Sequence, residues 1–208
     1  MSIVAVNNDI KDTLKKSNFT SGFLDNCLNS KFLSIEKNNS KIVGACFVGG
    51  TLNFNGIEIL EEFRGKGLGK KLLAEILSEC RKKNISFLTG VFKPSNIISI
   101  KAHTKIGYRA VFTSHYNKEE GREIFVILPF NKKGKILENF MKVFNTRIGN
   151  ALFTISFFLL NPFLKNIMAF SGDAIPKIDI SYSLRNFEKV QDTMKEVYSE
   201  NKDVVKHN

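Results

Sequence analysis

The sequence has 208 residues, of which 43% are hydrophobic and 25% charged, a globular composition that excludes collagen, long coiled coil and intrinsic disorder. This length predicts one domain, or one domain with a helical appendage. The net charge of +11 predicts a surface that attracts polyanions, acidic lipid headgroups or a polyphosphate cofactor. The positive charges form no long block, and basic and aromatic residues form no recognisable platform, so we expect no nucleic-acid partner.

The cysteines indicate the compartment. Cys27, Cys46 and Cys80 are scattered and lie in no Cys-x-x-Cys or Cys/His metal spacing. We therefore expect free thiols, no bound metal and a reducing, cytoplasmic location. The short apolar stretch at residues 1–6 is followed directly by polar residues, so we expect no signal peptide.

The predicted elements of the first part alternate between strands and helices. Apolar patterning and turn residues predict strands at 3–6, 32–36, 41–48 and 55–60 and helices at 9–16 and 23–28. Further on they predict strands at 85–91, 108–114 and 123–128 and helices at 68–80 and 96–105. This order predicts an α/β fold, a mixed central sheet flanked by helices.

The character of the chain changes beyond Pro129. An amphipathic helix is predicted over 136–148, an uncharged run follows at 148–164, and alternation predicts a strand at 178–182. A charged terminal helix is predicted from the spacing of Phe187, Val190, Met194 and Val197. We therefore predict one domain at 1–131 and a mostly helical C-terminal extension at 132–208, packing on the core or forming an interface.

A glycine-rich turn joins the strand at 55–60 to the helix at 68–80. The P-loop pattern fails because Arg64 stands where it needs glycine and Lys71 where it needs Ser or Thr. The dinucleotide pattern fails because Lys70 replaces its last glycine. The remaining pattern is Arg-x-x-Gly-x-Gly, leading from a strand into an amphipathic helix.

Such a turn suits a pyrophosphate. Glycine lets the backbone approach an anion without a Cβ in the way, and the free amides of the first helical turn point at it. Lys66, Lys70 and Lys71 add positive charge. The alternative is a tight connection without a ligand.

Two stretches in this order resemble signatures of a known family. Residues 59–73 (ILEEFRGKGLGKKLL) resemble the acyl-CoA signature of the GNAT superfamily of acetyl-CoA-dependent N-acetyltransferases. Asn96-x-x-Ser99 followed by residues 102–108 (AHTKIGY) resembles its second signature. The resemblance covers 41–108 and implies a GNAT-like fold.

The resemblance also implies a reaction, in which an amine of a small molecule or protein attacks acetyl-CoA directly in a ternary complex. Ile57 and Ile59 would hold the pantetheine arm through their backbone. Asn96, with Ser99 nearby on its helix, would contact the arm or help to fix the second signature. The pyrophosphate would lie on the turn, formed by Arg64, Gly65, Lys66, Gly67, Leu68, Gly69 and Lys70.

The catalytic groups are predicted by position. His103 stands where many relatives have a proton-donating tyrosine, and an imidazole can serve as the acid; the alternative is that it only packs against a ligand. The glutamate of many relatives falls on Asn53, so Glu58 is our candidate base, with a water relay or an already neutral amine as alternatives. An acyl-CoA-binding module without turnover is the alternative function.

The uncharged run at 148–164 leaves three interpretations open. It is a buried or interface helix, an element dipping into anionic lipid, or a membrane span at the lower limit of length. Lipid contact is suggested by the cations Lys132, Lys133, Lys135, Lys142 and Arg147 that precede it. We therefore predict peripheral membrane contact or a homodimer interface for the extension.

Overall fold

The computed structural model describes residues 2–116 and 121–185. The chain forms two compact units, Met1–Leu88 with Pro162–Ile175 and Thr89–Asn161 with Pro176–Asn208. The seven strands belong to a mixed sheet, with the order β1-β2-β3-β4 in the first unit and β5-β7-β6 from the boundary onward. This confirms the predicted α/β fold, a mixed sheet flanked by helices. The boundary that we place at residue 131 stays a prediction.

The first unit contains most of the predicted N-terminal elements. Its strands are β1 (Ser2–Val4), β2 (Ser30–Asn38), β3 (Lys41–Gly49) and β4 (Phe54–Ile59), each antiparallel to the next. Its helices are α1 (Asn8–Lys15), α2 (Ser21–Leu28), α3 (Leu68–Lys82) and α7 (Leu164–Met168), with short 3-10 turns η1 (Glu61–Phe63), η3 (Asn161–Phe163, which spans the unit boundary) and η4 (Gly172–Ala174). Strand β5 (Phe87–Phe92) crosses into the second unit.

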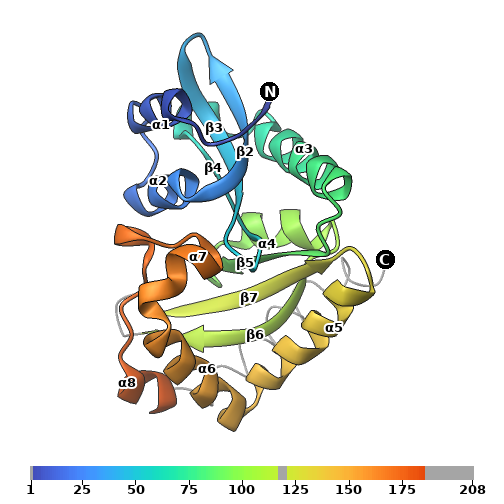
Figure 1. Ribbon diagram of the computed structural model, residues 1–208, viewed down its shortest axis with the longest axis vertical. Helices are drawn as coiled ribbons and strands as arrows, with labels where there is room; N and C mark the ends of the chain where they lie inside the picture. The colour runs from blue at the N-terminus through green and yellow to red at the C-terminus, as the bar shows by residue number, and fades with distance from the viewer. Residues whose placement is uncertain (1, 117–120, 186–208) are drawn as a thin grey trace. The chain divides into compact units, whose positions relative to one another are not determined.

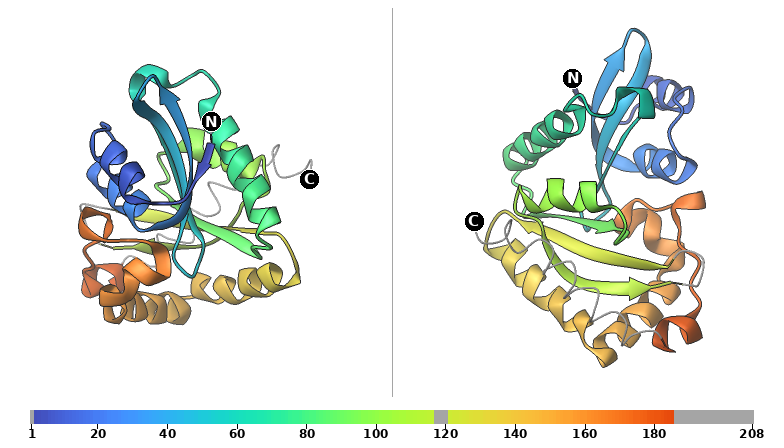
Figure 2. Two further views of the ribbon diagram at one scale, coloured as in Figure 1. Left: turned by 45° about the horizontal axis from the view of Figure 1, so that its top comes forward. Right: turned by 180° about the vertical axis from the view of Figure 1, so that it is seen from behind.

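Helices cover both faces of this part of the sheet. Figures 1 and 2 show α1 and α2 on one face of β2, β3 and β4 and α3 on the other. The apolar residues of α3 recur at helical spacing, and Leu72, Leu73, Ile76 and Cys80 are buried. All residues of β3 from Ile42 to Gly49 are buried, as expected for a strand covered on both faces.

A segment from the C-terminal part of the sequence, Pro162–Ile175, also belongs to the first unit. The backbone amides of Thr51 and Leu52 donate to the carbonyls of Asn166 and Ile167, at 2.8 and 3.0 Å. The Phe170 ring meets the Phe54 ring edge-on at a centroid distance of 4.7 Å. Residues 162–175 therefore complete the core of the N-terminal unit.

The second unit contains α4 (Ile97–Thr104), β6 (Arg109–His115), β7 (Arg122–Pro129), α5 (Lys132–Met141), η2 (Lys142–Asn145), α6 (Arg147–Leu159) and α8 (Ile180–Arg185). Strands β6 and β7 are antiparallel. Figure 2 shows α5 and α6 against one face of this pair. Aromatic rings fill the layer between them: Phe112 stacks on Phe125 at 4.3 Å, and Phe153 of α6 meets both rings at 4.7 and 5.0 Å.

The structure corrects two predictions for the C-terminal part. The helix predicted over 136–148 ends at Met141, and α6 starts afresh because Thr146 caps it, its hydroxyl accepting from the Gly149 amide at 3.1 Å. The strand predicted at 178–182 is wrong, since Ile180–Arg185 is helical. There the Asp179 carboxylate accepts from the Tyr182 amide at 2.9 Å, so a local cap outweighs the alternating pattern. The predicted terminal helix at Phe187 to Val197 lies outside the described residues.

Within residues 2–116 and 121–185, no single helix has the length and apolarity needed to cross a bilayer. A bent pair, Arg147–Leu159 with Asn161–Met168, passes that test only when taken together.

Candidate functional site

The predicted glycine-rich turn lies between β4 and α3 and is open. Gly65 and Gly67 have φ values of +77° and +72°, the left-handed region that favours glycine. A Cβ added to either residue would meet no atom within 4 Å. Since none of the residues that the structure describes fills this space, the glycines leave the backbone of the turn accessible.

The first turn of α3 offers free backbone donors. Lys71 is the first residue whose amide has a helical acceptor, the Gly67 carbonyl at 3.3 Å. Among the described residues, the amides of Leu68, Gly69 and Lys70 donate to no acceptor. The turn has no acidic residue but two exposed lysines, Lys70 and Lys71, which the helix dipole disfavours at an N-terminus. An anion bound here would satisfy the amides and offset this repulsion.

The remaining cations of the turn contact its own backbone. Arg64 donates from Nε to the Ile59 carbonyl at 3.0 Å. Lys66 donates to the Glu62 carbonyl at 3.3 Å, and its ammonium lies 5.1 Å from the centre of the Phe63 ring. Both side chains therefore stabilise the shape of the turn while adding positive charge to its rim.

The three predicted residues of β4 divide between its two faces. Ile57 and Ile59 pair with Cys46 and Gly44 of β3, and the side chain of Glu58 between them points to the opposite face. Its two carboxylate oxygens accept from the backbone amide and the hydroxyl of Thr20, at 3.0 and 2.7 Å.

The contact between Glu58 and Thr20 was not predicted. Thr20 precedes α2 and is its capping residue, but its hydroxyl makes no cap within the helix. A Thr before a helix is a recognisable cap signal, whereas its pairing with a residue far along the chain depends on the fold. Glu58 thus anchors the start of α2.

Asn53, at the position of the family's glutamate, is buried and has a φ of +46°. Its side-chain oxygen accepts from Lys31 at 2.8 Å, and its amide group donates to the Phe87 carbonyl at 3.2 Å. The Asn53 side chain therefore secures the entry to β4 and provides no proton acceptor.

The second unit brings Asn96, Ser99 and His103 together on α4. Asn96 caps the helix, its side-chain oxygen accepting from the Ser99 amide at 3.1 Å. The Nδ1 atom of His103 lies 2.8 Å from the Ser99 carbonyl oxygen and 3.4 Å from the Ser99 hydroxyl. Hydrogen bonds at Ser99 thus connect the capping residue Asn96 with His103, one helical turn further along α4.

His103 is held in one orientation and kept neutral. A carbonyl oxygen only accepts, so Nδ1 bears the hydrogen, and in the neutral ring Nε2 is an acceptor. The rings of Phe92 and Tyr108 lie at centroid distances of 4.6 and 5.1 Å. Burial lowers the pKa of His103, although the hydrogen bond to Ser99 opposes the shift.

No group of three or more His, Cys, Asp or Glu side chains that could hold a metal ion occurs in the part of the chain that the structure describes.

A family model described as Acetyltransferase (GNAT) family matches residues 11–108, which include the turn, β4 and the whole of α4. This segment belongs to the GNAT superfamily. A comparison with curated proteins returned no match.

Solved structures share the GNAT fold at low sequence identity. An Arabidopsis thaliana protein in complex with the bisubstrate analogue CoA-Ac-MVNAL is 22% identical, with a TM-score of 0.51 over 62% of this chain and 98% of that one. The ribosomal-protein-S18-alanine N-acetyltransferase of Escherichia coli is 17% identical, with a TM-score of 0.51 over 62% and 94%. A GNAT acetyltransferase of Elizabethkingia anophelis with acetyl-CoA bound is 18% identical, with a TM-score of 0.50 over 62% and 97%.

Proposed function

We propose that this GNAT protein is an N-acetyltransferase that transfers the acetyl group of acetyl-CoA to a primary amine, by direct attack in a ternary complex. The observation that supports this most is the open turn, where free helix amides and exposed lysines lie beside a space that no atom of the described residues fills. Acetyl-CoA carries a pyrophosphate and supplies an acetyl group activated as a thioester. The turn has the charge and the donors that a pyrophosphate needs.

The residues that would hold acetyl-CoA are the ones predicted from the sequence. The backbone from Arg64 to Lys70 would bind the pyrophosphate through its amides. The backbone of Ile57 and Ile59 would bind the pantetheine arm, and Asn96 would contact it through its amide group. Asn96 suits this role because only its oxygen is used in capping α4, and Ser99 keeps that oxygen in place.

Proton transfer falls to His103 in this proposal. Its Nε2 atom has no hydrogen-bond partner among the described residues, whereas both carboxylate oxygens of Glu58 accept from Thr20. An acid role at Nε2 requires the imidazolium, which burial disfavours. We therefore infer that Nε2 takes the proton lost by the attacking amine and then releases it to the departing sulfur, so that CoA leaves as a thiol.

Glu58 stays the second candidate for the base. Its test is the pair Glu58→Gln and Thr20→Val, both of which loosen the anchor of α2. If Glu58 takes a proton, only Glu58→Gln lowers kcat by about a hundredfold or more. If Glu58 is only an anchor, the two variants behave alike.

The acceptor is a primary amine on a small molecule or a protein, and the compartment we propose is the cytoplasm. All three cysteines are free and buried, which favours a reducing environment. The basic surface disfavours polycationic acceptors, because like charges slow the encounter.

The test is calorimetry with acetyl-CoA followed by thiol release with a panel of amines. We expect heat of binding, thiol release with at least one amine, and release lowered about a hundredfold in His103→Gln with binding retained. Absence of binding would overturn the whole proposal.

One observation favours a second function, an acyl-CoA-binding module without turnover. Asn53 cannot accept a proton at the position where many relatives have a glutamate, and its side chain is held by hydrogen bonds with Lys31 and Phe87. Binding of acetyl-CoA without thiol release on any amine would establish this alternative.

A further inference from the structure

Helix α6 presents its most apolar face outward. Ile148, Leu152, Ile155 and Leu159 recur at spacings of four, three and four, and all are exposed, Ile148 to 76%. The inner face contains the Phe153 and Phe157 rings and beside them the polar residues Asn150 and Thr154, both buried. In a helix that served only to cover the sheet, the apolar residues would lie inward and the polar residues outward.

Hydrogen bonds fix α6 in this rotation. The amide group of Asn150, on the inner face, donates to the Thr113 carbonyl of β6 at 2.6 Å and to the Phe144 carbonyl at 3.4 Å. Turning the apolar face inward would break both of these hydrogen bonds. These hydrogen bonds therefore hold α6 with its apolar face outward.

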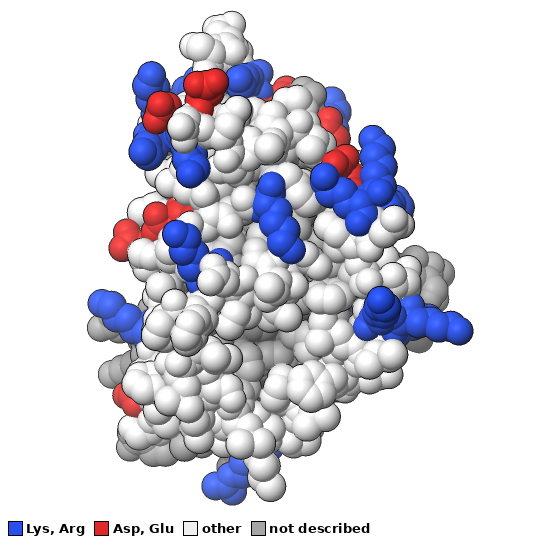
Figure 3. Space-filling view, viewed as in Figure 1, with Lys and Arg blue, Asp and Glu red and all other residues white. Residues whose placement is uncertain are grey.

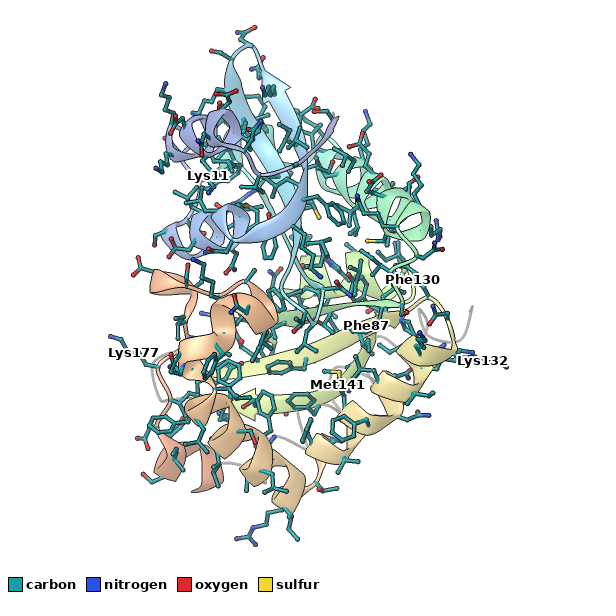
Figure 4. All side chains as sticks on the ribbon, in the orientation of Figure 1. Lys11, Phe87, Phe130, Lys132, Met141 and Lys177 are labelled. Atoms are coloured by element: carbon teal, nitrogen blue, oxygen red, sulfur yellow. The ribbon has the colours of Figure 1, made fainter. Side chains whose placement is uncertain are left out.

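Exposed apolar residues also occur on the preceding helix and the turn after it. Ile136 and Phe140 of α5 and Val143 of η2 are exposed, at spacings of four and three. Figure 4 shows Met141 pointing from α5 toward the strands and Lys132 pointing away from them. We call the outward apolar residues of this stretch the apolar strip: Ile136, Phe140, Val143, Ile148, Leu152, Ile155 and Leu159.

The charges beside the apolar strip have one sign. Its exposed cations are Lys132, Lys133, Lys135, Lys142 and Arg147. The acid of α5, Glu138, is buried and accepts from Lys142 at 2.8 Å and from Arg109 at 3.5 Å. From residue 139 to 172 the sequence has no Asp or Glu. Figure 3 accordingly shows blue but no red over α5 and α6.

We propose that the apolar strip docks this protein on the surface of an anionic lipid membrane. Exposed Ile, Leu and Phe side chains flanked by lysines suit insertion at the headgroup level, where the cations meet lipid phosphates. Charge complementarity favours this occupant over a second copy of the chain, which would bring the same cations against one another. In this proposal the helices lie along the membrane surface.

The experiment is cosedimentation of the full chain with vesicles of phosphatidylcholine, with and without phosphatidylglycerol. We expect binding to the anionic vesicles that weakens with salt. The double variant Ile148→Gln, Leu152→Gln should lower the partition coefficient about tenfold or more. The triple variant Lys132→Gln, Lys133→Gln, Lys135→Gln should lower it about a hundredfold on anionic vesicles only.

Ile98→Gln is the matched control, because Ile98 is 85% exposed on α4, outside the apolar strip; we expect it to bind vesicles like the unaltered chain. Circular dichroism checks that the exposed substitutions leave the fold intact. Three results would overturn the proposal. They are no vesicle binding, a dimer by light scattering that the double variant dissociates, and vesicle binding that appears only after Phe187→Gln and Val190→Gln, which would make the terminal segment the occupant.

Discussion

Two glycines with the same conformation allow a controlled test of the turn before α3. Gly67 and Gly121 both have a φ of +72°, and a Cβ added to either would meet no atom within 4 Å. Alanine at either site pays only for the left-handed backbone, about 1–2 kcal/mol. In a protein of this size each kcal/mol lowers Tm by roughly 2–4 °C, so Gly67→Ala and Gly121→Ala should lose similar stability.

Only Gly67→Ala should weaken the binding of acetyl-CoA. Its Cβ would enter the space in front of the free amides of Leu68 and Gly69, where the pyrophosphate would lie. Loss of one charge-assisted hydrogen bond costs about 2 kcal/mol, which is roughly 30-fold in Kd. Calorimetry measures the affinities and thermal unfolding the stabilities. Equal affinities in the two variants, despite equal losses of Tm, would refute the assignment of these amides to the pyrophosphate.

Three further predictions concern the second unit. Burial lowers the pKa of His103 below the unfolded value near 6.5. On acidification, this residue is therefore protonated in the unfolded chain before it is protonated in the folded chain. The free energy of unfolding therefore loses nothing to this residue above about pH 6.5 and decreases on acidification. His103→Gln should make the difference in the free energy of unfolding between pH 7 and pH 5 smaller, as measured by urea unfolding. Asn96→Ala and the matched cap variant Asn131→Ala should each cost about 1 kcal/mol of stability, but only Asn96→Ala should raise KM for acetyl-CoA. Asn150→Ala should cost about 1 kcal/mol by removing the hydrogen bond from its amide group to the Thr113 carbonyl, and an unchanged Tm would show that this bond adds no stability.

Local signals predicted the parts of the site that local physics determines. The glycines of the turn, the apolar spacing of α3 and the helix that starts after Asn96 each follow from a few neighbouring residues, and the structure contains all three. The helix predicted around His103 is confirmed, but no local pattern indicates that Nδ1 binds the Ser99 carbonyl. That contact depends on the ring's rotamer, which Phe92 and Tyr108 help to set.

Contacts between distant segments were beyond prediction from one sequence. The pairing of Glu58 with Thr20 requires α2 to lie beside β4, and no periodicity reports that arrangement. The apolar run at 148–164 was ambiguous for the same reason, because periodicity gives the spacing of a helix face but not the side on which the strands lie. Asn150 determines that side, because its amide group donates to the Thr113 carbonyl of β6.

The return of residues 162–175 to the first unit has a consequence for biosynthesis. Gly50 lies so close to this segment that an added Cβ would fall 2.3 Å from the Ile167 carbonyl oxygen, so the two backbones are in direct contact. During translation, the amino-terminal unit cannot complete its core until residues 162–175 have been synthesised, so part of its apolar interior stays uncovered until then. We therefore expect the nascent chain to depend on chaperones during this interval, and chains that terminate before residue 162 to leave the first unit incomplete, even though its first elements emerge early.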